Sequence, residues 1–382
     1  MRCTITSTIM RVLLTFGVGL GVTTLAPAPA PAQGSRPAHG RDVPVRPARV
    51  GAGTEPASAA HARRPSYHVL ATHLLGGDGG WDYLALDTAG NRLFIARSDR
   101  IMVVDPAKGT LLGEIPGLHR AHGVAFSYAA GHGFATSGAD STAIMFDLAT
   151  LKVLGRTPVG ADDDAILYDH ASMHVFTMNG DAGTASVIDA ASGKRLGTIP
   201  LGGKPEFGVS AGNGKVYINL EDEGAIVELD TKAMKVTRSW SIAPCESPTG
   251  LAIDVAHDRL FSVCRNKLMA ISDISAGKLL TTLPIGAGVD GARFDPATGD
   301  VFASNGEGSL TVVHESTPAD FQVVQTVPTI GGARTLELDP RSHRVFVVGA
   351  KFGEAPAQPT ASNPRRRAPM VPGSFTLVVI GR

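Results

Sequence analysis

Short apolar runs recur along the chain from residue 66 onward, and they come in groups of four. One group spans residues 248–254, 259–263, 268–273 and 279–284, where apolar and β-branched residues are interrupted by turns rich in Gly, Asp and Lys. Short runs of this kind between turn residues predict β-strands. Four such strands in about 40 residues are typical of one blade of a β-propeller.

The group recurs seven times with fixed landmarks. The seven units are residues 81–118, 121–160, 163–203, 205–246, 247–288, 289–332 and 333–382. One position of the second run is aromatic in every unit: Phe94, Phe134, Phe176, Tyr217, Phe261, Phe302 and Phe346. A repeat of this length, kept in register through seven copies, predicts an all-β fold, a seven-bladed β-propeller with four-stranded blades.

An aspartate ends the third run of five units, where its carboxylate can accept hydrogen bonds from the amides of the following hairpin turn. These residues are Asp105, Asp147, Asp189, Asp230 and Asp273. The sixth unit has His314 in this position. We assign these landmarks to folding rather than to chemistry.

The seventh unit has only three runs, at residues 334–339, 344–348 and 375–380. The run at residues 68–74, just before the first unit, can supply the missing outer strand. Pairing the N-terminal strand with the last blade removes the open sheet edge and closes the ring. We therefore expect residues 66–382 to form one propeller domain.

The first 65 residues have a different composition. Arg2 and Arg11 accompany an apolar stretch at 12–25, and Ala30-Pro31-Ala32 provides small residues at a cleavage site. This pattern predicts a signal peptide at residues 1–32 and a periplasmic or secreted protein. An uncleaved membrane anchor is the alternative, but the stretch is short of the roughly 20 residues that span a bilayer. Residues 33–65, rich in Ala, Pro and Arg, are expected to be a disordered linker.

The blade motifs resemble those of a known family. Val-x-Val-x-Asp strand ends followed by Thr/Ser-Gly-Lys turns, the Pro-x-Gly joints and the predicted export are similar to the YVTN or YncE-like propellers. The resemblance covers residues 67–382 and implies the propeller fold. It also implies DNA binding, since the family is often described so, although surface-layer and other extracytoplasmic proteins carry the same repeat.

The charge distribution argues against duplex DNA as a partner. Eight of the 35 Lys and Arg residues and two of the 35 Asp and Glu residues precede residue 66. The predicted propeller therefore holds 27 basic and 33 acidic residues, a net charge of −6. Proteins that bind duplex DNA concentrate basic residues on one face. We rank nucleic acid last among the partners.

Three cysteines are present, of which Cys3 lies in the predicted signal peptide. Cys245 lies in the loop entering the fifth unit and Cys264 ends the second run of that unit. Both positions fall on the same face of one blade, in a chain expected in an oxidising compartment. We therefore predict a structural disulfide between them, with two separate buried thiols as the alternative.

Polar residues enter the inner strand of every unit, where a propeller opens its central channel. They are Asp82, His122, Asp164, Glu206, Thr249, Asp290 and Arg334. Ionisable side chains that converge in a concavity predict a ligand-binding site at the channel mouth. A water-filled channel whose polar lining is merely solvated is the alternative.

Loops on the same face add further oxygen-bearing side chains, a set that suits a hard cation of the calcium type. The candidate metal ligands are Asp164, Glu206, Asp290, Asn219 and Asn305. Calcium-dependent lactonase propellers offer an analogy at the level of the fold. Residues 351–374, a Pro-rich insertion with Arg365-Arg366-Arg367, emerge on this face and either cover the mouth or form a mobile loop.

The sequence contains no legible pair of nucleophile and base. Gly208-Val-Ser-Ala-Gly212 has the spacing of a nucleophile elbow, but it spans a predicted hairpin instead of a strand-to-helix turn. We therefore expect a monomeric, non-enzymatic, extracytoplasmic propeller that binds a ligand or a protein partner at its channel face. A metal-dependent, lactonase-like hydrolase is the second interpretation and a DNA-binding propeller the third. A calcium-type cation is the one cofactor that the residues suggest.

Overall fold

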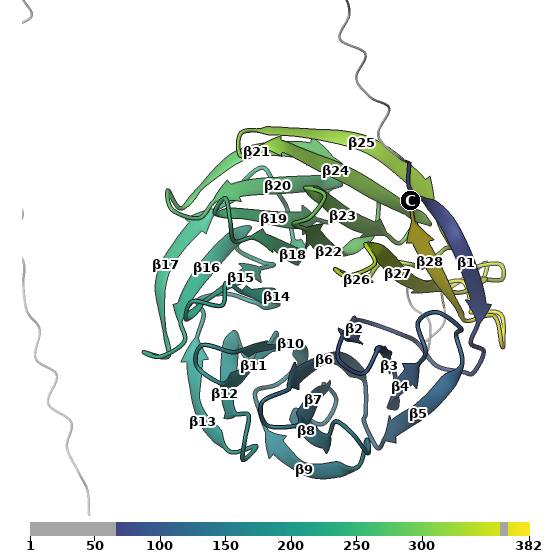
Figure 1. The fold of residues 1–382 in the computed structure, drawn as a ribbon, viewed down its shortest axis with the longest axis horizontal. Helices are drawn as coiled ribbons and strands as arrows, with labels where there is room; N and C mark the ends of the chain where they lie inside the picture. Colours follow the sequence, from purple (N-terminus) through teal and green to yellow (C-terminus); the bar gives the residue numbers. More distant parts are fainter. Residues whose placement is uncertain (1–65, 360–365) are drawn as a thin grey trace, which may run out of the picture. The chain divides into compact units, whose positions relative to one another are not determined.

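A computed structural model describes residues 66–359 and 366–382 of the chain. These residues form seven four-stranded antiparallel sheets arranged as the blades of a propeller around a central channel (Figure 1). The predicted all-β, seven-bladed fold is thereby confirmed. No helix in the described ranges is long and apolar enough to cross a membrane. The predicted signal peptide and linker lie outside the described residues.

Each of blades one to six uses four consecutive strands, from the channel outward. Blade one contains β2 (Leu84–Asp87), β3 (Arg92–Arg97), β4 (Arg100–Val104) and β5 (Leu111–Pro116). Blade two contains β6 (Ala121–Ser127), β7 (His132–Ser137), β8 (Thr142–Asp147) and β9 (Val153–Pro158). Blade three contains β10 (Asp163–Asp169), β11 (His174–Asn179), β12 (Thr184–Asp189) and β13 (Arg195–Pro200).

The next three blades repeat the order. Blade four contains β14 (Pro205–Ser210), β15 (Lys215–Leu220), β16 (Ala225–Asp230) and β17 (Lys235–Ser241). Blade five contains β18 (Pro248–Asp254), β19 (Arg259–Cys264), β20 (Leu268–Asp273) and β21 (Lys278–Pro284). Blade six contains β22 (Val289–Asp295), β23 (Asp300–Asn305), β24 (Ser309–Thr317) and β25 (Asp320–Pro328).

Blade seven joins the two ends of the ring, as the sequence predicts. Its sheet runs β26 (Leu336–Asp339), β27 (Arg344–Gly349), β28 (Thr376–Gly381) and β1 (His68–Leu74), with β1 antiparallel to β28. Figure 1 shows β1 as the outer strand beside β28. Tyr67 adds a second attachment, because its hydroxyl donates to Asp300 at 2.9 Å and its ring packs edge-on against Phe302 at 5.1 Å.

The core lies between neighbouring blades. All seven aromatic landmark residues of the second strands are buried, with at most 3% of their surface exposed. Phe302 shows the arrangement, since it packs in one cluster with Leu336 and Val345 of the next blade. Removing large aromatic side chains from water is a dominant stabilising contribution, which explains why this position repeats.

The aspartates that end the third strands accept hydrogen bonds from turn amides, as expected. Asp147, for example, accepts from the Thr150 amide at 2.7 Å. Blade six differs because His314 cannot play this role. His314 instead contacts Asp300 of the adjacent strand at 2.9 Å, and the strands β24 and β25 continue for nine residues each. The hairpin of blade six is therefore longer than the corresponding hairpin of any other described blade.

Cys245 and Cys264 form the predicted disulfide, with α-carbons 5.6 Å apart. Both half-cystines are buried in the cluster that surrounds Leu251 and Leu260. The bridge fastens the loop that follows β17 to the end of β19. It therefore holds the connection between blades four and five to the channel-mouth side of blade five.

Candidate functional site

Five of the seven predicted mouth residues form a continuous chain of charges across the channel. Arg334, just before β26, donates to Asp290 of β22 at 2.9 Å and to Asp82, just before β2, at 3.0 Å. His122 of β6 then lies with its Nδ1 2.6 Å from Asp82 and 3.2 Å from Asp164 of β10. Five successive blades, from the sixth round to the third, thus each contribute one ionisable group.

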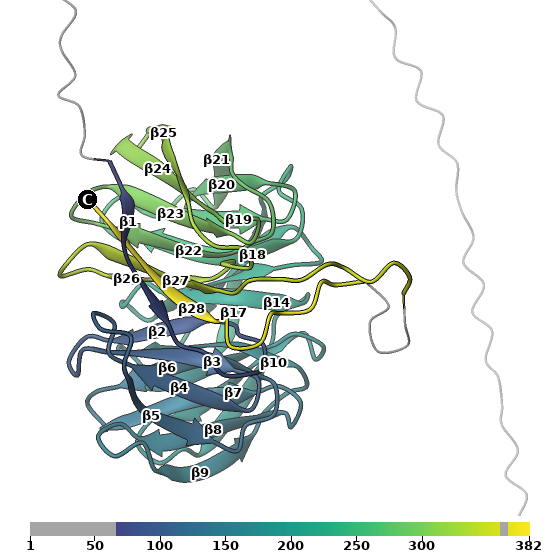
Figure 2. The same cartoon turned by 90° about the vertical axis from the view of Figure 1, so that its right-hand side faces the viewer.

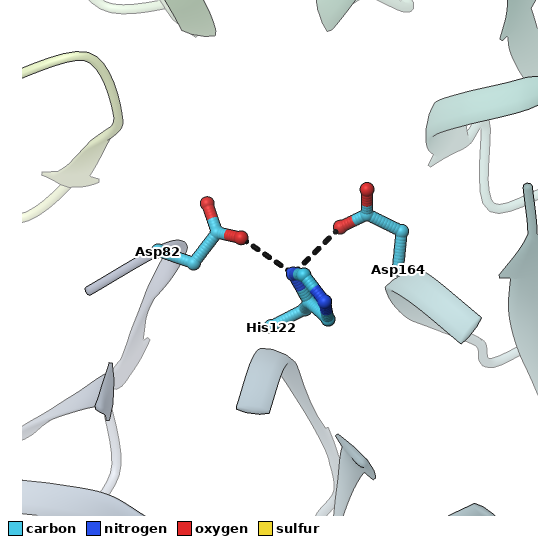
Figure 3. A group of neighbouring side chains, drawn as sticks. All are labelled: Asp82, His122 and Asp164. Atoms are coloured by element: carbon cyan, nitrogen blue, oxygen red, sulfur yellow. Dashed lines mark hydrogen bonds and ion pairs between the residues drawn. The ribbon is translucent and has the colours of Figure 1, made fainter. Parts of the chain in front are cut away.

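Figure 3 shows the centre of this chain. The carboxylates of Asp82 and Asp164 approach the His122 ring from two sides and both point at Nδ1. Their convergence follows from the propeller geometry, since each residue stands at the same end of an inner strand in a neighbouring blade. The three donor atoms lie within 4.8 Å of one another. This spacing allows all three to bind one metal ion.

Glu206 of β14 extends the acidic set into blade four. Its partner is Arg265, in the turn between β19 and β20, with Nη2 at 3.7 Å from Glu206. Arg265 also forms an ion pair with Glu221 at 2.6 Å, and its side chain is 56% exposed. The guanidinium of blade five is therefore shared between two carboxylates at the rim of the channel.

Burial shifts the pKa values of the ionisable groups at the mouth. Burial raises the pKa of Asp164 well above its ordinary value, and the nearby Asp82 and Asp290 carboxylates raise it further. Burial also raises the pKa of Glu206, again with help from Asp164 and Asp290. For Arg334, burial alone would lower the pKa, but Asp82 and Asp290 outweigh it and keep the guanidinium charged. The mouth thus holds more acidic groups than its fixed cations neutralise.

Several polar atoms of this set have no hydrogen-bond partner among the described residues. They are the buried atoms Oδ1 of Asp290 and Nε2 of His122, and the buried Oδ1 of Asp164 has only its 3.2 Å ion-pair contact with His122 Nδ1. A buried polar atom without a partner costs free energy, so native structures normally supply a partner from protein, water or ion. A cation bound by Asp82, His122 and Asp164 would satisfy Oδ1 of Asp164.

Three of the predicted residues have side chains that bond within or between blades. Thr249 is fully buried, and its hydroxyl bonds the carbonyls of Val263 and Val289, so it joins blades five and six instead of facing the mouth. Asn219 is also fully buried, and its amide group bonds the backbone of Thr249. Asn305 donates to Ser309 and Thr311 within its own blade. Asn219 is thus engaged in blade structure, whereas Oδ1 of Asn305 is buried without a hydrogen-bond partner among the described residues.

Below the mouth lies a layer of aromatic and charged residues that the sequence did not reveal. Tyr83 packs against Phe207 with ring centroids 5.0 Å apart, and Arg293 pairs with Glu337 at 2.9 Å. On the far side of this layer is a cavity of about 540 Å³ whose lining includes Phe126. The lining of this cavity includes none of the predicted mouth residues. Tyr83 directly follows Asp82 in the chain, which was the available signal for it.

The blade-seven insertion meets the mouth at its base. A pocket of about 690 Å³ lies there, lined by Trp81, Arg334, Phe352 and Met370 among others. Phe352 and Met370 form an isolated β-bridge, which joins the two limbs of the insertion. Figure 2 shows these limbs in yellow, running away from the ring beyond their base. The described limbs thus border the mouth, and Arg365 lies outside the described residues.

Comparisons with solved structures find the same fold in proteins of very different sequence. A chain of Kuenenia stuttgartiensis hydrazine synthase is 14% identical, with a TM-score of 0.63 over 77% of this chain and 95% of that chain. U3-55K is 11% identical, with a TM-score of 0.68 over 82% of this chain and 99% of that chain. Such low identities establish the propeller fold alone. No protein-family profile and no curated protein matches the sequence.

Proposed function

We propose that this protein is an extracytoplasmic binding propeller whose channel mouth binds a divalent cation. One observation carries the proposal: four buried or nearly buried carboxylates surround the mouth, Oδ1 of Asp290 has no hydrogen-bond partner among the described residues, and Oδ1 of Asp164 has only its 3.2 Å contact with His122. Arg334 and Arg265 supply only two fixed positive charges against them. The raised pKa values of Asp164 and Glu206 show that the metal-free mouth favours protons on its carboxyl groups, and a bound cation would take the place of those protons.

The donor set indicates the class of cation. Asp82, His122 and Asp164 combine one imidazole nitrogen with carboxylate oxygens. Calcium prefers oxygen ligands alone, whereas imidazole with carboxylate suits zinc, manganese and related transition metals. We therefore favour a transition metal over the calcium-type ion that the sequence suggested. His122 and Asp164 would hold the metal, and the open side of the mouth leaves room for a further ligand.

Export and the resemblance to YVTN or YncE-like propellers fit the same proposal. A disulfide persists in oxidising compartments, so the Cys245–Cys264 bridge supports a location outside the cytoplasm. An acidic mouth repels polyanions, which disfavours nucleic acid as the partner. A metal-dependent, lactonase-like hydrolase is the second candidate, because the same three ligands could present a metal to a substrate. A screen for lactone hydrolysis with metal-loaded protein tests that alternative.

The binding proposal is tested with the double variant Asp164→Asn, Asp290→Asn. Chelator-treated protein is titrated with Mn²⁺, Zn²⁺ and Ca²⁺ by calorimetry. We expect the variant to bind the transition metal at least tenfold more weakly than wild type, because one ligand charge and one neighbouring charge are lost. Tenfold corresponds to about 1.4 kcal/mol of binding free energy.

A second double variant, Asp181→Asn with Glu223→Gln, provides the matched control. Both residues are exposed in turns on the same face, so the net charge changes equally while the mouth is intact. This control should bind the metal like wild type. Equal affinities for wild type and the Asp164→Asn, Asp290→Asn variant would show that the mouth is not the cation site.

A further inference from the structure

A second group of metal-binding side chains lies on the face opposite the channel mouth, where blades five and six meet. Asp254 ends β18, His257 lies in the turn that follows, and Glu315 belongs to the extended strand β24 of blade six. The Nδ1 atom of His257 is 2.5 Å from Oδ2 of Asp254 and 3.5 Å from Oε1 of Glu315. All three donor atoms lie within 4.8 Å of one another. We call these residues the blade-junction cluster.

The position of Glu315 is unusual when the blades are compared. It directly follows the third-strand landmark residue, and the equivalent residues of the first five blades are Pro106, Leu148, Ala190, Thr231 and Ile274. All five are uncharged and buried. Glu315 places a carboxylate in the same buried position, with its side chain only 2% exposed. Blade packing therefore does not account for an acidic residue here.

The carboxylate of Glu315 also lacks the partners that a buried charge requires. In the part of the chain that the structure describes, neither of its oxygens accepts a hydrogen bond within normal distance, and its charged contact is His257, whose Nδ1 lies 3.5 Å from Oε1. The nearby cation, Arg259, is engaged elsewhere, since it donates to the carbonyl of Pro318 at 2.8 Å and to Asp273 at 3.0 Å. A second buried carboxylate, Asp254, faces the same space. The two buried carboxylates therefore share a single imidazole as their charged contact, and a bound cation would stabilise both of them.

We propose that the blade-junction cluster binds a divalent transition metal of the zinc class. Asp254, His257 and Glu315 supply two oxygens and one nitrogen, a donor set that zinc accepts with bonds of about 2.0–2.2 Å. Tetrahedral geometry at that bond length separates donor atoms by about 3.4 Å, so the observed donors need only small shifts. The other oxygen of Asp254 accepts the Ala256 amide at 2.9 Å and holds the carboxylate in place.

A metal ion can reach the blade-junction cluster from solvent through the half-exposed imidazole of His257. The side chain of His257 is 48% exposed, whereas both carboxylates are buried beneath it. A metal bound to Nδ1 and to the Asp254 carboxylate would replace the contact between these two groups, and the neutral imidazole would then carry its proton on Nε2. Water completes the fourth position. The bound metal would join the long hairpin of blade six to the β18–β19 turn of blade five.

The test compares full-length, chelator-treated wild type with Glu315→Gln, titrated with Zn²⁺ and with Co²⁺ as a spectroscopic probe. We expect the variant to bind one equivalent of Zn²⁺ fewer than wild type and to lose the visible bands of tetrahedral Co²⁺. The mouth variant Asp164→Asn, Asp290→Asn should keep this equivalent, so failure of the mouth proposal is distinguishable from failure here. Glu223→Gln, at an exposed position, is the matched control and should bind like wild type.

The melting temperature provides a second measurement that distinguishes loss of metal binding from loss of folding. In the presence of chelator, Glu315→Gln and Glu315→Thr should melt at or above the wild-type temperature, because each removes an unpaired buried charge and Thr is the residue of blade four. Added Zn²⁺ should raise the melting temperature of wild type and leave that of both variants unchanged. Equal zinc stoichiometry in wild type and Glu315→Gln, or the absence of any zinc bound by wild type, would overturn the proposal.

Discussion

Arg97 is a fully buried arginine that holds the glycine-rich segment between β1 and β2. Its guanidinium donates to the carbonyls of Asp78 at 2.8 Å and Gly80 at 3.1 Å, and it lies 3.7 Å from the ring centre of Phe375. A planar group with several donors can satisfy these carbonyls together, whereas an ammonium group cannot. The side chain therefore shapes the segment that positions Asp82 at the mouth.

We expect Arg97→Lys to lower the free energy of unfolding by roughly 2–4 kcal/mol, because buried carbonyls lose their donors. Urea denaturation measures the change. Arg195→Lys serves as the control, since Arg195 is exposed and makes a single long hydrogen bond of 3.4 Å. A loss for Arg97→Lys no larger than for Arg195→Lys would contradict this role.

The protonation of the mouth predicts how cation binding depends on pH. Burial raises the pKa of Asp290 to about 6, against the opposing effect of Arg334. Asp290 is therefore largely neutral at pH 5 and ionised at pH 8, and metal affinity should increase over this interval. Calorimetry at several pH values measures it. Glu206→Gln should flatten the high-pH part of the profile, because burial raises the pKa of Glu206 further still.

The same shifts predict the opposite trend for stability without metal. A carboxyl group whose pKa is raised by folding binds its proton more tightly in the folded state. Its stabilising contribution is complete below the unfolded pKa of about 4 and is lost as the pH rises through the folded pKa. Chelated protein should thus be less stable at pH 8 than at pH 5, and added metal should reverse the order. A pH-independent melting temperature in chelator would count against buried carboxyl groups at the mouth.

The mouth residues could be predicted because the repeat fixes where each inner strand begins. His122 and Asp164 occupy equivalent positions in adjacent blades, so their meeting follows from the period alone. Thr249 shows the limit of this prediction, because its side chain is buried between blades five and six instead of facing the mouth. Sequence periodicity places the residue but does not determine the direction of its side chain. Arg265 comes from another loop, and only the folded chain shows that its guanidinium reaches Glu206.

At the scale of single elements, the positions of the strands could be predicted from the apolar runs and the turn residues between them. The length of the hairpin formed by β24 and β25 could not. His314 in place of the landmark aspartate was visible in the sequence, yet the extension of β24 and β25 to nine residues each was not. Arg259 bonds the carbonyl of Pro318 in the extended hairpin. Contacts between elements distant in sequence decide such lengths.

The disulfide belongs to this scale as well. The two cysteines are 19 residues apart in the sequence. A crosslink that closes a loop of this length lowers the entropy of the unfolded chain and thereby stabilises the folded state by about 3 kcal/mol. We expect the double variant Cys245→Ala, Cys264→Ala to lose approximately that free energy of unfolding under oxidising conditions. In reducing buffer, wild type and variant should become similar. A variant as stable as oxidised wild type would contradict a stabilising bridge.

At the scale of the whole molecule, seven blades could be predicted because each unit repeats the same buried aromatic and the last unit lacks one strand. The ring closure between β1 and β28 now gives a direct test. Deleting residues 66–75 should destabilise the entire propeller, because blade seven loses its outer strand and exposes the β28 edge. Deleting residues 33–64 should leave the melting temperature unchanged. Equal melting temperatures for both truncations would contradict the closure.

Closure by the first and last strands also determines when the molecule can be completed. Whether the chain leaves a ribosome or crosses a membrane from its N-terminus, β1 emerges before every other strand of the ring and its partner β28 emerges last. Six blades can form from strands that are neighbours in the sequence while β1 is still unpaired. The apolar residues Val69, Leu70 and Leu74 of β1 are exposed. Pairing across so long a separation is slow, and an unpaired apolar strand can meet the edge of another nascent chain. The newborn propeller is therefore most prone to aggregation just before its final strand arrives.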